Sequence, residues 1–591
     1  MIEKMGQPLP LGVTIMGDLI NFSVEAKPSR ECKLLLYEKG KNIPEIILDM
    51  TEELGTVRYL AVSGLDPAEY EYNYLIDGVV TVDPYAKAIA GKETWGEKKE
   101  VSNHEIRGRF QKEDYDWGED RPLEIPYYQV IAYSLHVRGY TMHSSSRVKK
   151  KGTFRGLVEK IPYLLDLGIN QVHLMPVYEF EECLSYRNYW GYGAGYYYAP
   201  KSSYAASKDA VRELKDMVKA FHKAGIEVVL EMPFTGETPK RMIEDCLRYY
   251  RMEYHIDGFI VNPLVTPMDS VNTDPILKRT KIMIHDVGFQ TTMRRFLKGD
   301  EGVVSDVIYW LKRPSAEHQM FNYITNQNGF TLQDLVSYDG KHNEENGEHN
   351  QDGPEYNYSW NCGVEGVTRK KAVLSLRERQ IKNAYALVLL AQGTPCILAG
   401  DEFGNTQKGN NNVYCQDNPV AWLDWKKLEK QKDLHNYVKK LIALRKAHPV
   451  FCPEKEFLGI DQTKCGIPDI SYHGENAWQT PSEVSSRLLG VYYSGAGLKT
   501  ADCFVAYNMH WEEHKFALPA LAKKKKWYKV MSTVDGVAEI PEKLESGRFI
   551  EVKARTIMVL VAADDIEDKK EEYEVHKKDI KDEKAIEEYA E

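Results

Sequence analysis

Hydrophobic positions change their spacing twice along this chain of 591 residues. From residue 11 to about residue 120, apolar and polar side chains alternate in short runs such as 20–24, 33–37 and 70–76, and Gly, Pro and Asp turns separate the runs. Alternation with a period of two is typical of strands that bury one face. We therefore predict an immunoglobulin-like β-sandwich over residues 1–120.

The middle of the chain has a different pattern. Short apolar runs at 170–177 and 227–230 are separated by an amphipathic stretch at 211–223. Regular alternation of strand and helix predicts a parallel sheet with helices packed around it. The length fits a (β/α)8 TIM barrel. We therefore assign residues 121–449 to a barrel of the α/β class.

The helical pattern ends after Pro449. Apolar runs at 489–493, 503–507 and 556–561 predict a C-terminal all-β domain, a second β-sandwich, over residues 450–563. Residues 564–591 hold 13 acidic and 6 basic side chains with few apolar ones. This composition predicts a charged tail that is disordered or helical, with a role in docking a partner as the alternative.

Composition narrows the class of protein. No apolar run approaches the ~20 residues that span a bilayer, and the first residues show no signal peptide, so we predict a cytoplasmic protein without a membrane segment. The nine cysteines form no Cys-x-x-Cys pair and no Cys/His cluster at metal-ligand spacing, so we predict no structural zinc, no other metal and no cofactor. The net charge of −11 argues against nucleic acid as a partner.

Aromatic side chains are abundant, with 38 tyrosines and 10 tryptophans. Flat rings with a polar edge suit both the apolar faces and the hydroxyl rims of sugars. Packing in a core is the alternative role for any single ring.

Several long motifs resemble one enzyme family. They are the segments 133–141, 188–192, 340–348, 358–363 and 399–404. Together they resemble the isoamylase-type, glycogen-debranching branch of glycoside hydrolase family 13, within the α-amylase superfamily. Residues 12–14 and 21–24 are similar to an appended carbohydrate-binding module of family 48. The resemblance implies a barrel with a sandwich on either side, and it covers all but the charged tail.

The resemblance also indicates where the catalytic groups should be. Retaining glycosidases use a carboxylate nucleophile and a carboxylic acid on the two sides of the scissile bond. In the debranching family these groups and a third Asp follow the barrel strands, at positions that here are Asn262, His285 and Asn328. An amide cannot form the glycosyl ester of the family mechanism. We therefore interpret all three positions as degenerate.

Other positions depart from the same pattern. Ile260 replaces an Arg, Gln327 replaces a His, and Gly236 lies where an Asn-His pair is expected. Glu231 keeps a charge at the end of the third strand. The family's long loops are also missing at 238–242 and 288–294.

These departures lead to the interpretation of a pseudoenzyme. We predict a non-catalytic protein that binds α-glucan such as glycogen or maltooligosaccharide, with an active debranching enzyme as a possible partner. The first alternative is an active α-1,6-glucosidase, or another α-glucan hydrolase, with relocated carboxylates. A protein-interaction scaffold is the second alternative.

Candidate residues for each role can be named. For relocated chemistry they are Glu231, Glu237, Asp257 and Asp286, although Asp257 and Asp286 are better explained as structural. The family resemblance implies that Tyr192 stacks on a sugar ring. The predicted glucan contacts are Tyr189, Trp190, Tyr192, Tyr196, Asp401 and Asn411.

Overall fold

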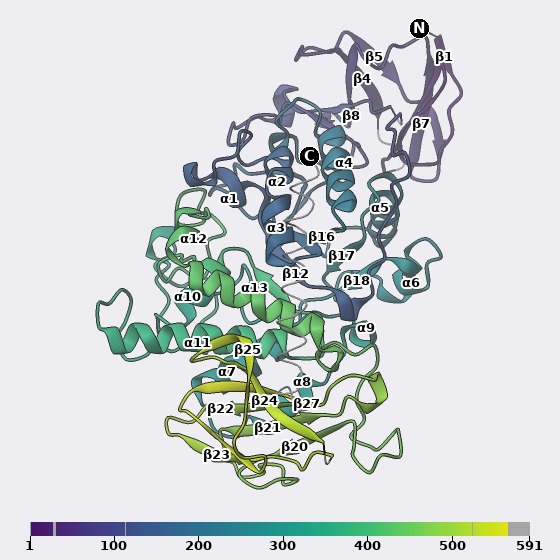
Figure 1. Cartoon of the computed structure of the whole chain (residues 1–591). Helices are drawn as coiled ribbons and strands as arrows, with labels where there is room; N and C mark the ends of the chain where they lie inside the picture. The colour runs from purple at the N-terminus through teal and green to yellow at the C-terminus, as the bar shows by residue number, and fades with distance from the viewer. Residues whose placement is uncertain (1, 28–30, 113, 523, 565–591) are drawn as a thin grey trace, which may run out of the picture.

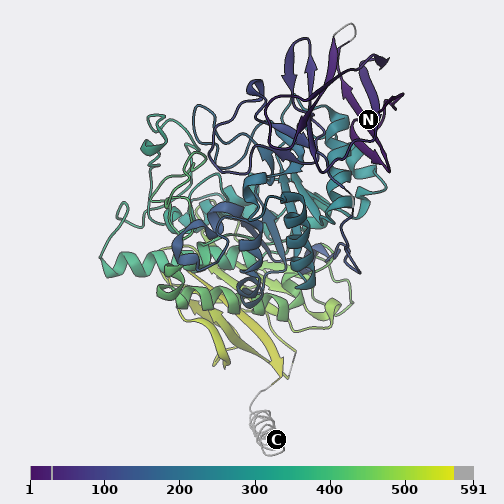
Figure 2. The same ribbon diagram turned by 90° about the horizontal axis from the view of Figure 1, so that it is seen from above.

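The computed structural model describes residues 2–27, 31–112, 114–522 and 524–564, arranged as a barrel between two β-rich ends (Figure 1). The N-terminal strands and the C-terminal β-domain lie at opposite ends of the barrel, and the view from above shows the same order (Figure 2). The predicted charged tail lies outside the described residues after Asp564.

The N-terminal part consists of two antiparallel sheets. The first has the order β1-β7-β3-β2 with β6 beside β7, and the second has the order β10-β11-β8-β4-β5 with β9 beside β8. Alternating side chains such as Phe22, Leu36, Leu60 and Tyr72 meet in a shared core. The strands are β1 (Ile2–Lys4), β2 (Gly12–Met16), β3 (Leu19–Glu25), β4 (Cys32–Glu38), β5 (Ile46–Asp49), β6 (Glu52–Leu54), β7 (Val57–Ser63), β8 (Tyr70–Ile76), β9 (Val79–Thr81), β10 (Ile89–Ala90) and β11 (Arg107–Arg109).

The middle of the chain forms a parallel sheet with the order β18-β17-β16-β13-β12-β19. Its strands are β12 (Ala132–Leu135), β13 (Gln171–Leu174), β16 (Glu227–Met232), β17 (Gly258–Val261), β18 (Lys281–Met283) and β19 (Cys396–Leu398). Parallel bridges from Ile284 to Met320 and from Asn322 to Pro395 close the sheet into a barrel. The predicted α/β barrel with flanking β-domains is confirmed.

Helices surround the barrel, and two short β-strands, β14 (Tyr178–Phe180) and β15 (Gly195–Pro200), pair at its edge. The longer helices are α4 (Ala210–Lys223), α5 (Lys240–Glu253), α7 (Val287–Lys298), α8 (Val304–Leu311), α11 (Lys371–Leu389) and α13 (Lys432–Ala447). The shorter ones are α1 (Val137–Met142), α2 (Phe154–Val158), α3 (Ile161–Leu167), α6 (Met268–Thr273), α9 (Ser315–His318), α10 (Leu332–Leu335) and α12 (Lys426–Lys430). In the described part of the chain, no helix is long and apolar enough to cross a membrane.

Apolar side chains from different strands fill the barrel interior. Ala132, Val229, Ile260, Met283 and Phe321 belong to one buried cluster. Ile260 is part of this packing, so the apolar residue that replaces the family's Arg contributes to the core rather than to a charged site.

The C-terminal part is antiparallel. Its larger sheet has the order β20-β21-β22-β27-β24-β25, and β23 pairs separately with β26. The strands are β20 (Ile470–His473), β21 (Leu488–Tyr493), β22 (Cys503–Asn508), β23 (His514–Ala517), β24 (Lys525–Ser532), β25 (Gly536–Lys543), β26 (Phe549–Val552) and β27 (Thr556–Asp564). Helices α11 and α13 contact this domain through β27 and β25.

Candidate active site

The Glu231 carboxylate lies at the C-terminal end of the barrel strands. Glu231 lies on β16 and is only 9% exposed. The Tyr192 hydroxyl donates a hydrogen bond of 2.7 Å to its Oε1, and Gln327 Nε2 donates to the same hydroxyl at 2.7 Å. Gln327 Nε2 also lies 3.4 Å from both carboxylate oxygens. Burial, followed by the charge of Glu231, raises the pKa of Tyr192 well above its usual value, so this phenol remains a donor.

An imidazole lies beside this carboxylate. His285 follows β18 by two residues, and its Nε2 is 3.4 Å from Glu231 Oε1. Its ring contacts Phe321 and Tyr323 edge-on, with centroids 5.3 Å and 5.8 Å away. Neither ring nitrogen of His285 has a hydrogen-bond partner in the structure described. Glu231 and His285 therefore meet as a carboxylate and an imidazole at ion-pair distance, without a hydrogen bond between them.

The residue at the family's nucleophile position, Asn262, is bound in a backbone turn. Asn262 is exposed, and its Oδ1 accepts a hydrogen bond of 3.0 Å from the backbone N–H of Leu264. Its carbonyl accepts from the N–H of Val265 at 3.1 Å. The amide thus closes a turn at the end of β17, a usual role for Asn.

Two other residues that differ from the family pattern, Asn328 and Gly236, have no contact with Glu231 or His285 among those described. Asn328 and Gly236 are exposed, and no atom lies within 4 Å of the position where a Cβ of residue 236 would be. Gln327 is the exception, because it reaches both Tyr192 and Glu231.

Three other acidic candidates have separate environments. Asp257 is buried and accepts from the backbone N–H groups of Leu123 and Val228, each at 2.8 Å. Asp286 caps α7 by accepting from the Gly288 N–H at 2.6 Å, in agreement with the predicted structural role of both residues. Glu237 is exposed on the connection to α5. The connections to α5 and α7 are short, as the sequence predicts.

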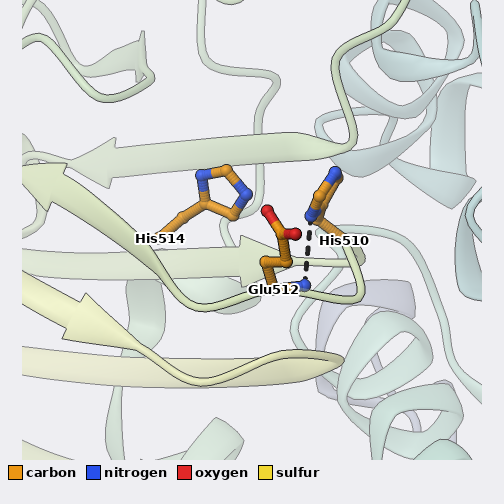
Figure 3. Close-up of side chains that lie close together, drawn as sticks. All are labelled: His510, Glu512 and His514. Atoms are coloured by element: carbon orange, nitrogen blue, oxygen red, sulfur yellow. Dashed lines mark hydrogen bonds between the residues drawn. The ribbon is translucent and has the colours of Figure 1, made fainter.

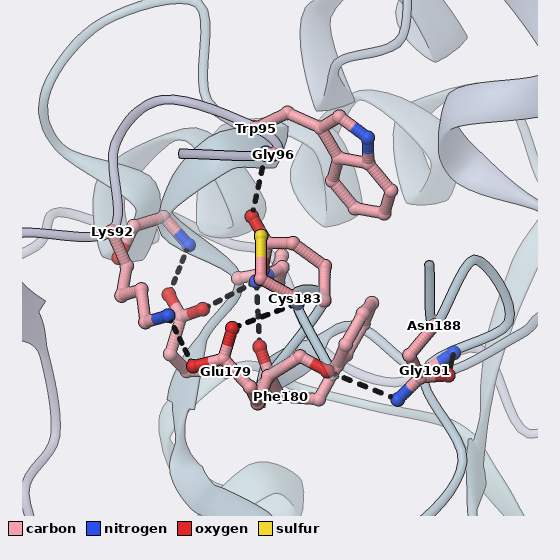
Figure 4. A network of polar contacts seen from close by, with 12 residues as sticks. Lys92, Trp95, Gly96, Glu179, Phe180, Cys183, Asn188 and Gly191 are labelled. Carbon is pink, nitrogen blue, oxygen red and sulfur yellow. Dashed lines mark hydrogen bonds and ion pairs between the residues drawn. The ribbon is translucent and has the colours of Figure 1, made fainter. Parts of the chain in front are cut away.

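A buried ion cluster that includes Glu179 holds the start of the aromatic loop, which is the segment 181–194 between β14 and β15 (Figure 4). Lys201 Nζ donates to Glu179 Oε1 at 2.6 Å, to Glu182 Oε2 at 2.5 Å and to the Phe180 carbonyl at 2.8 Å. Glu182 also accepts from the Gly96 N–H at 3.1 Å. The start of the loop is therefore fixed by charge-assisted hydrogen bonds.

Asn188 continues this support toward the aromatic residues. Its Nδ2 donates to the carbonyls of Glu181 and Tyr192, and its Oδ1 accepts from the Gly191 N–H at 3.1 Å. Gly191 has a φ of +83°, and an added Cβ would lie 2.3 Å from the Phe180 ring, so only glycine fits. These constraints position Tyr192 over Glu231.

The predicted glucan contacts are not all brought together. Tyr189 is buried with its ring 4.1 Å from that of His136, and Trp190 packs 5.6 Å from Tyr192. Tyr196 packs against the apolar cluster that contains Val82, near the N-terminal sheets. Tyr192 is the predicted ring that contacts the carboxylate directly.

Asp401 and Asn411 lie in the interior. Asp401 accepts hydrogen bonds from the Thr325 hydroxyl and from the Leu332 N–H, and burial raises its pKa to about 8. Asn411 is fully buried, accepts from Asn343 Nδ2 at 2.8 Å and donates to Asn357 Oδ1 at 2.9 Å. Because protein groups occupy both side chains, the structure gives them a role in holding loops rather than a free surface for sugar.

A small cavity adjoins the site. It has a volume of about 60 Å³, and its lining includes His136, Tyr189, Trp190 and Gln327.

Two buried histidines make the stability of the barrel depend on pH. Burial lowers the pKa of His136 to about 4 and that of His173 to about 3. A histidine in the unfolded chain has a pKa of about 6.5. Below that pH these two side chains bind protons in the unfolded chain but not in the folded one. We expect stability to fall as the pH decreases from about 6.5 to about 4, by up to about 1.4 kcal/mol per pH unit for each histidine.

Melting temperatures between pH 7 and pH 5 check this expectation. His173→Met should flatten the slope, whereas His342→Gln, at an exposed histidine, should leave the slope unchanged. Parallel slopes for all three proteins would contradict it.

The comparisons place the chain among named relatives. The model for "Alpha amylase, catalytic domain" matches residues 136–235. The glycogen operon protein GlgX homolog of Mycobacterium tuberculosis is 30% identical, with 94% of this chain and 96% of that protein covered. Chloroplastic isoamylase 3 of Oryza sativa is 30% identical, with 89% of this chain and 83% of that protein covered.

Solved structures show the same fold. Pullulanase type I of Bacillus subtilis, complexed with maltose, has a TM-score of 0.72 and 20% identity, with 93% of this chain and 85% of that chain covered. Pullulanase of Paenibacillus barengoltzii complexed with maltohexaose and α-cyclodextrin also has a TM-score of 0.72 at 20% identity, with 94% and 95% covered.

These relatives contradict the prediction of a non-catalytic protein. Proteins that align with most of the chain are named as glycogen operon proteins and isoamylases, so the prediction of a pseudoenzyme is wrong. The inference gave too much weight to positions 262 and 285 taken separately. In the fold, the Asn262 amide forms a turn while Glu231 and His285 lie together at the end of the barrel. The extent of the match to these relatives shows that the chain belongs to the isoamylase and GlgX branch of the α-amylase family.

Proposed function

We propose that this protein is a debranching hydrolase that cleaves α-1,6 linkages in glycogen-type α-glucan. The observation that carries the proposal is the contact between Glu231 and His285 beneath Tyr192, at the end of the barrel where active sites of this fold lie. The names of the relatives support the reaction, and the pullulanases solved with maltose and maltohexaose support α-glucan as the substrate. The proposal needs no second debranching enzyme as a partner.

Substrate contact is assigned to the aromatic residues above the pair. Tyr192 is half-buried, and Trp190 packs against it with ring centroids 5.6 Å apart. A sugar ring that stacks here would bring its glycosidic oxygen toward the polar groups beneath Tyr192.

The residues present suit a proton relay. Hydrolysis adds water across the α-1,6 glycosidic bond, which joins C1 of one glucose to O6 of the next. The oxygen of the water bonds to C1, the bond from C1 to O6 breaks, and O6 takes a proton. We assign His285 as the proton donor to O6, and the neutral imidazole then accepts the proton of the incoming water. The Glu231 carboxylate orients His285 and stabilises the positive charge that develops at C1. Asn262 takes no part, because an amide does not form a glycosyl ester.

A reducing-sugar assay on pullulan and amylopectin tests the proposal. The purified protein should release reducing ends from both, and unbranched maltodextrin should release far fewer because it lacks α-1,6 linkages. A clean preparation that binds glycogen but releases no sugar from any of these substrates would contradict the assigned reaction.

Removing the Tyr192 hydroxyl should weaken catalysis moderately. Tyr192→Phe leaves Glu231 without a 2.7 Å hydrogen bond, a loss of about 1–1.5 kcal/mol that corresponds to roughly a tenfold fall in kcat/KM. The melting temperature should change little because the ring remains. Tyr186→Phe, at an exposed tyrosine of the same loop, is the control and should retain full activity. Equal kcat/KM for both variants would show that the Tyr192 hydroxyl does not contribute to catalysis.

A further inference from the structure

Three potential metal ligands meet far from the barrel site, in the C-terminal β-domain. His510, Glu512 and His514 lie on and beside the connection between β22 and β23. One ligand atom from each residue lies within 4.8 Å of the others. Figure 3 shows the Glu512 carboxylate between the two imidazole rings. Two imidazoles and one carboxylate form a donor set typical of zinc and other first-row transition metals.

The backbone that carries these residues is firmly held. Asn508 Nδ2 donates to the carbonyls of Glu512, Val552 and Lys553 at 2.9 to 3.0 Å. Its Oδ1 accepts from the His510 N–H at 2.9 Å. One buried amide therefore fixes the whole connection before any ion binds, which lowers the entropic cost of assembling the ligands.

His514 is already oriented as a ligand. Its Nδ1 lies 3.0 Å from Glu475 Oε1, and because a carboxylate can only accept, this nitrogen carries the proton. Its Nε2 is buried and has no hydrogen-bond partner in the described structure. A histidine that donates one N–H to a carboxylate and offers the other nitrogen is the usual arrangement around protein-bound zinc.

His510 supplies the second imidazole. Its Nδ1 accepts a hydrogen bond of 3.1 Å from the Glu512 N–H, so a lone pair is present on the nitrogen that faces Glu512. The ring stacks on Trp511 with centroids 4.0 Å apart and lies 4.6 Å from the His514 ring. A cation bound at this nitrogen would replace one weak hydrogen bond with a coordination bond.

Neighbouring charges are compatible with a cation. Arg487 is nearby, but its Nη2 pairs with Glu301 at 2.9 Å. Arg555 donates to the carbonyls of Leu297 and Lys298. Glu475 and Glu512 contribute two negative charges directly at the imidazoles. The local balance therefore favours a divalent ion over an anion.

The cluster borders a polar pocket of about 470 Å³. Its lining includes Glu475, Arg487, His510, Trp511 and His514. A three-ligand site beside such a pocket leaves a coordination position for water or a small anion.

We propose that His510, Glu512 and His514 bind one zinc ion, with Glu475 as the hydrogen-bonded support of His514. Tetrahedral coordination at about 2.1 Å brings ligand atoms to about 3.4 Å from one another. The Glu512 side chain is exposed, so its carboxylate can rotate toward the two imidazoles. The ion would connect the β22–β23 loop to the start of β23.

Zinc titration of the full chain tests the proposal. With ZnCl2 and a competing chromophoric chelator, the protein should bind one equivalent with micromolar or tighter affinity, and a large excess of CaCl2 should not compete. His514→Ala should raise the Kd at least 100-fold. Glu475→Gln, an exposed substitution that leaves all three ligands in place, should raise it 10- to 100-fold.

His342→Ala, at an exposed histidine outside the cluster, is the matched control and should bind zinc like the unmodified chain. Unchanged affinity in both His514→Ala and Glu475→Gln would overturn the proposal, as would the absence of one-equivalent binding.

Discussion

Glu231→Gln should lower kcat on amylopectin by at least about 100-fold, because it removes the carboxylate that orients His285 and stabilises developing positive charge. The substitution preserves shape, so Tyr192 and Gln327 can keep their hydrogen bonds to residue 231. KM and the melting temperature should therefore change little. Steady-state kinetics and a thermal melt measure these effects separately.

Glu237→Gln is the matched control for this prediction. Residue 237 is an exposed glutamate on the connection that follows Glu231, so the same chemical change should leave kcat intact. If Glu231→Gln keeps full activity, or if Glu237→Gln loses as much, the carboxylate has been assigned wrongly.

The double variant Glu231→Gln/His285→Gln gives a stronger test of the pair. Two groups that move one proton act as a unit, so the double variant should be scarcely slower than the worse single variant. Losses that multiply would indicate that Glu231 and His285 act in independent steps.

The fold was predictable because its signals are local. The apolar run at 227–230 predicts a strand, and β16 covers Glu227–Met232. Likewise the amphipathic stretch 211–223 lies within α4. Each signal depends on neighbours a few residues apart, so one sequence is enough to read it.

The site was predictable only in part. The resemblance identified Tyr192 and the strand end that carries Glu231, and the structure brings both together with Gln327. The contact between Glu231 and His285 joins two strands separated in the sheet by β17, and spacing along the chain does not reveal it. Treating each position separately therefore missed this contact.

Asp401 and Asn411 were predicted to contact glucan, but both side chains are buried and bonded to protein groups. A polar residue in a loop near a barrel end can face either sugar or its own backbone, and the sequence does not distinguish these choices. The cluster around His510 has a weak sequence signal, the pattern His-x-Glu-x-His, which contains none of the cysteines on which the prediction of metal ligands depended. The Glu475 partner lies 39 residues away and required the fold.

Lys201→Met should be among the most destabilising single changes in the barrel domain. Lys201 is 0% exposed and is the cation for both Glu179 and Glu182, which are buried as well. Burial alone would lower the pKa of Lys201, but the two carboxylates raise it, so the ammonium is charged in the folded protein. Methionine fills the volume but leaves two buried carboxylates without a counter-charge. The expected cost is about 3–5 kcal/mol.

Melting temperature and activity together check this prediction. The destabilisation should shrink as the pH is lowered toward 5, because burial raises the pKa of Glu179 and this carboxylate can bind a proton when its cation is missing. Hydrolysis should fall too, since the cluster fixes the start of the loop that carries Tyr192. Lys92→Met is the matched control: its partner Glu181 is 35% exposed, so water can solvate the carboxylate, and the loss should stay below about 1 kcal/mol. Equal melting temperatures for the two variants would mean that the Lys201 cluster does not hold the loop in place.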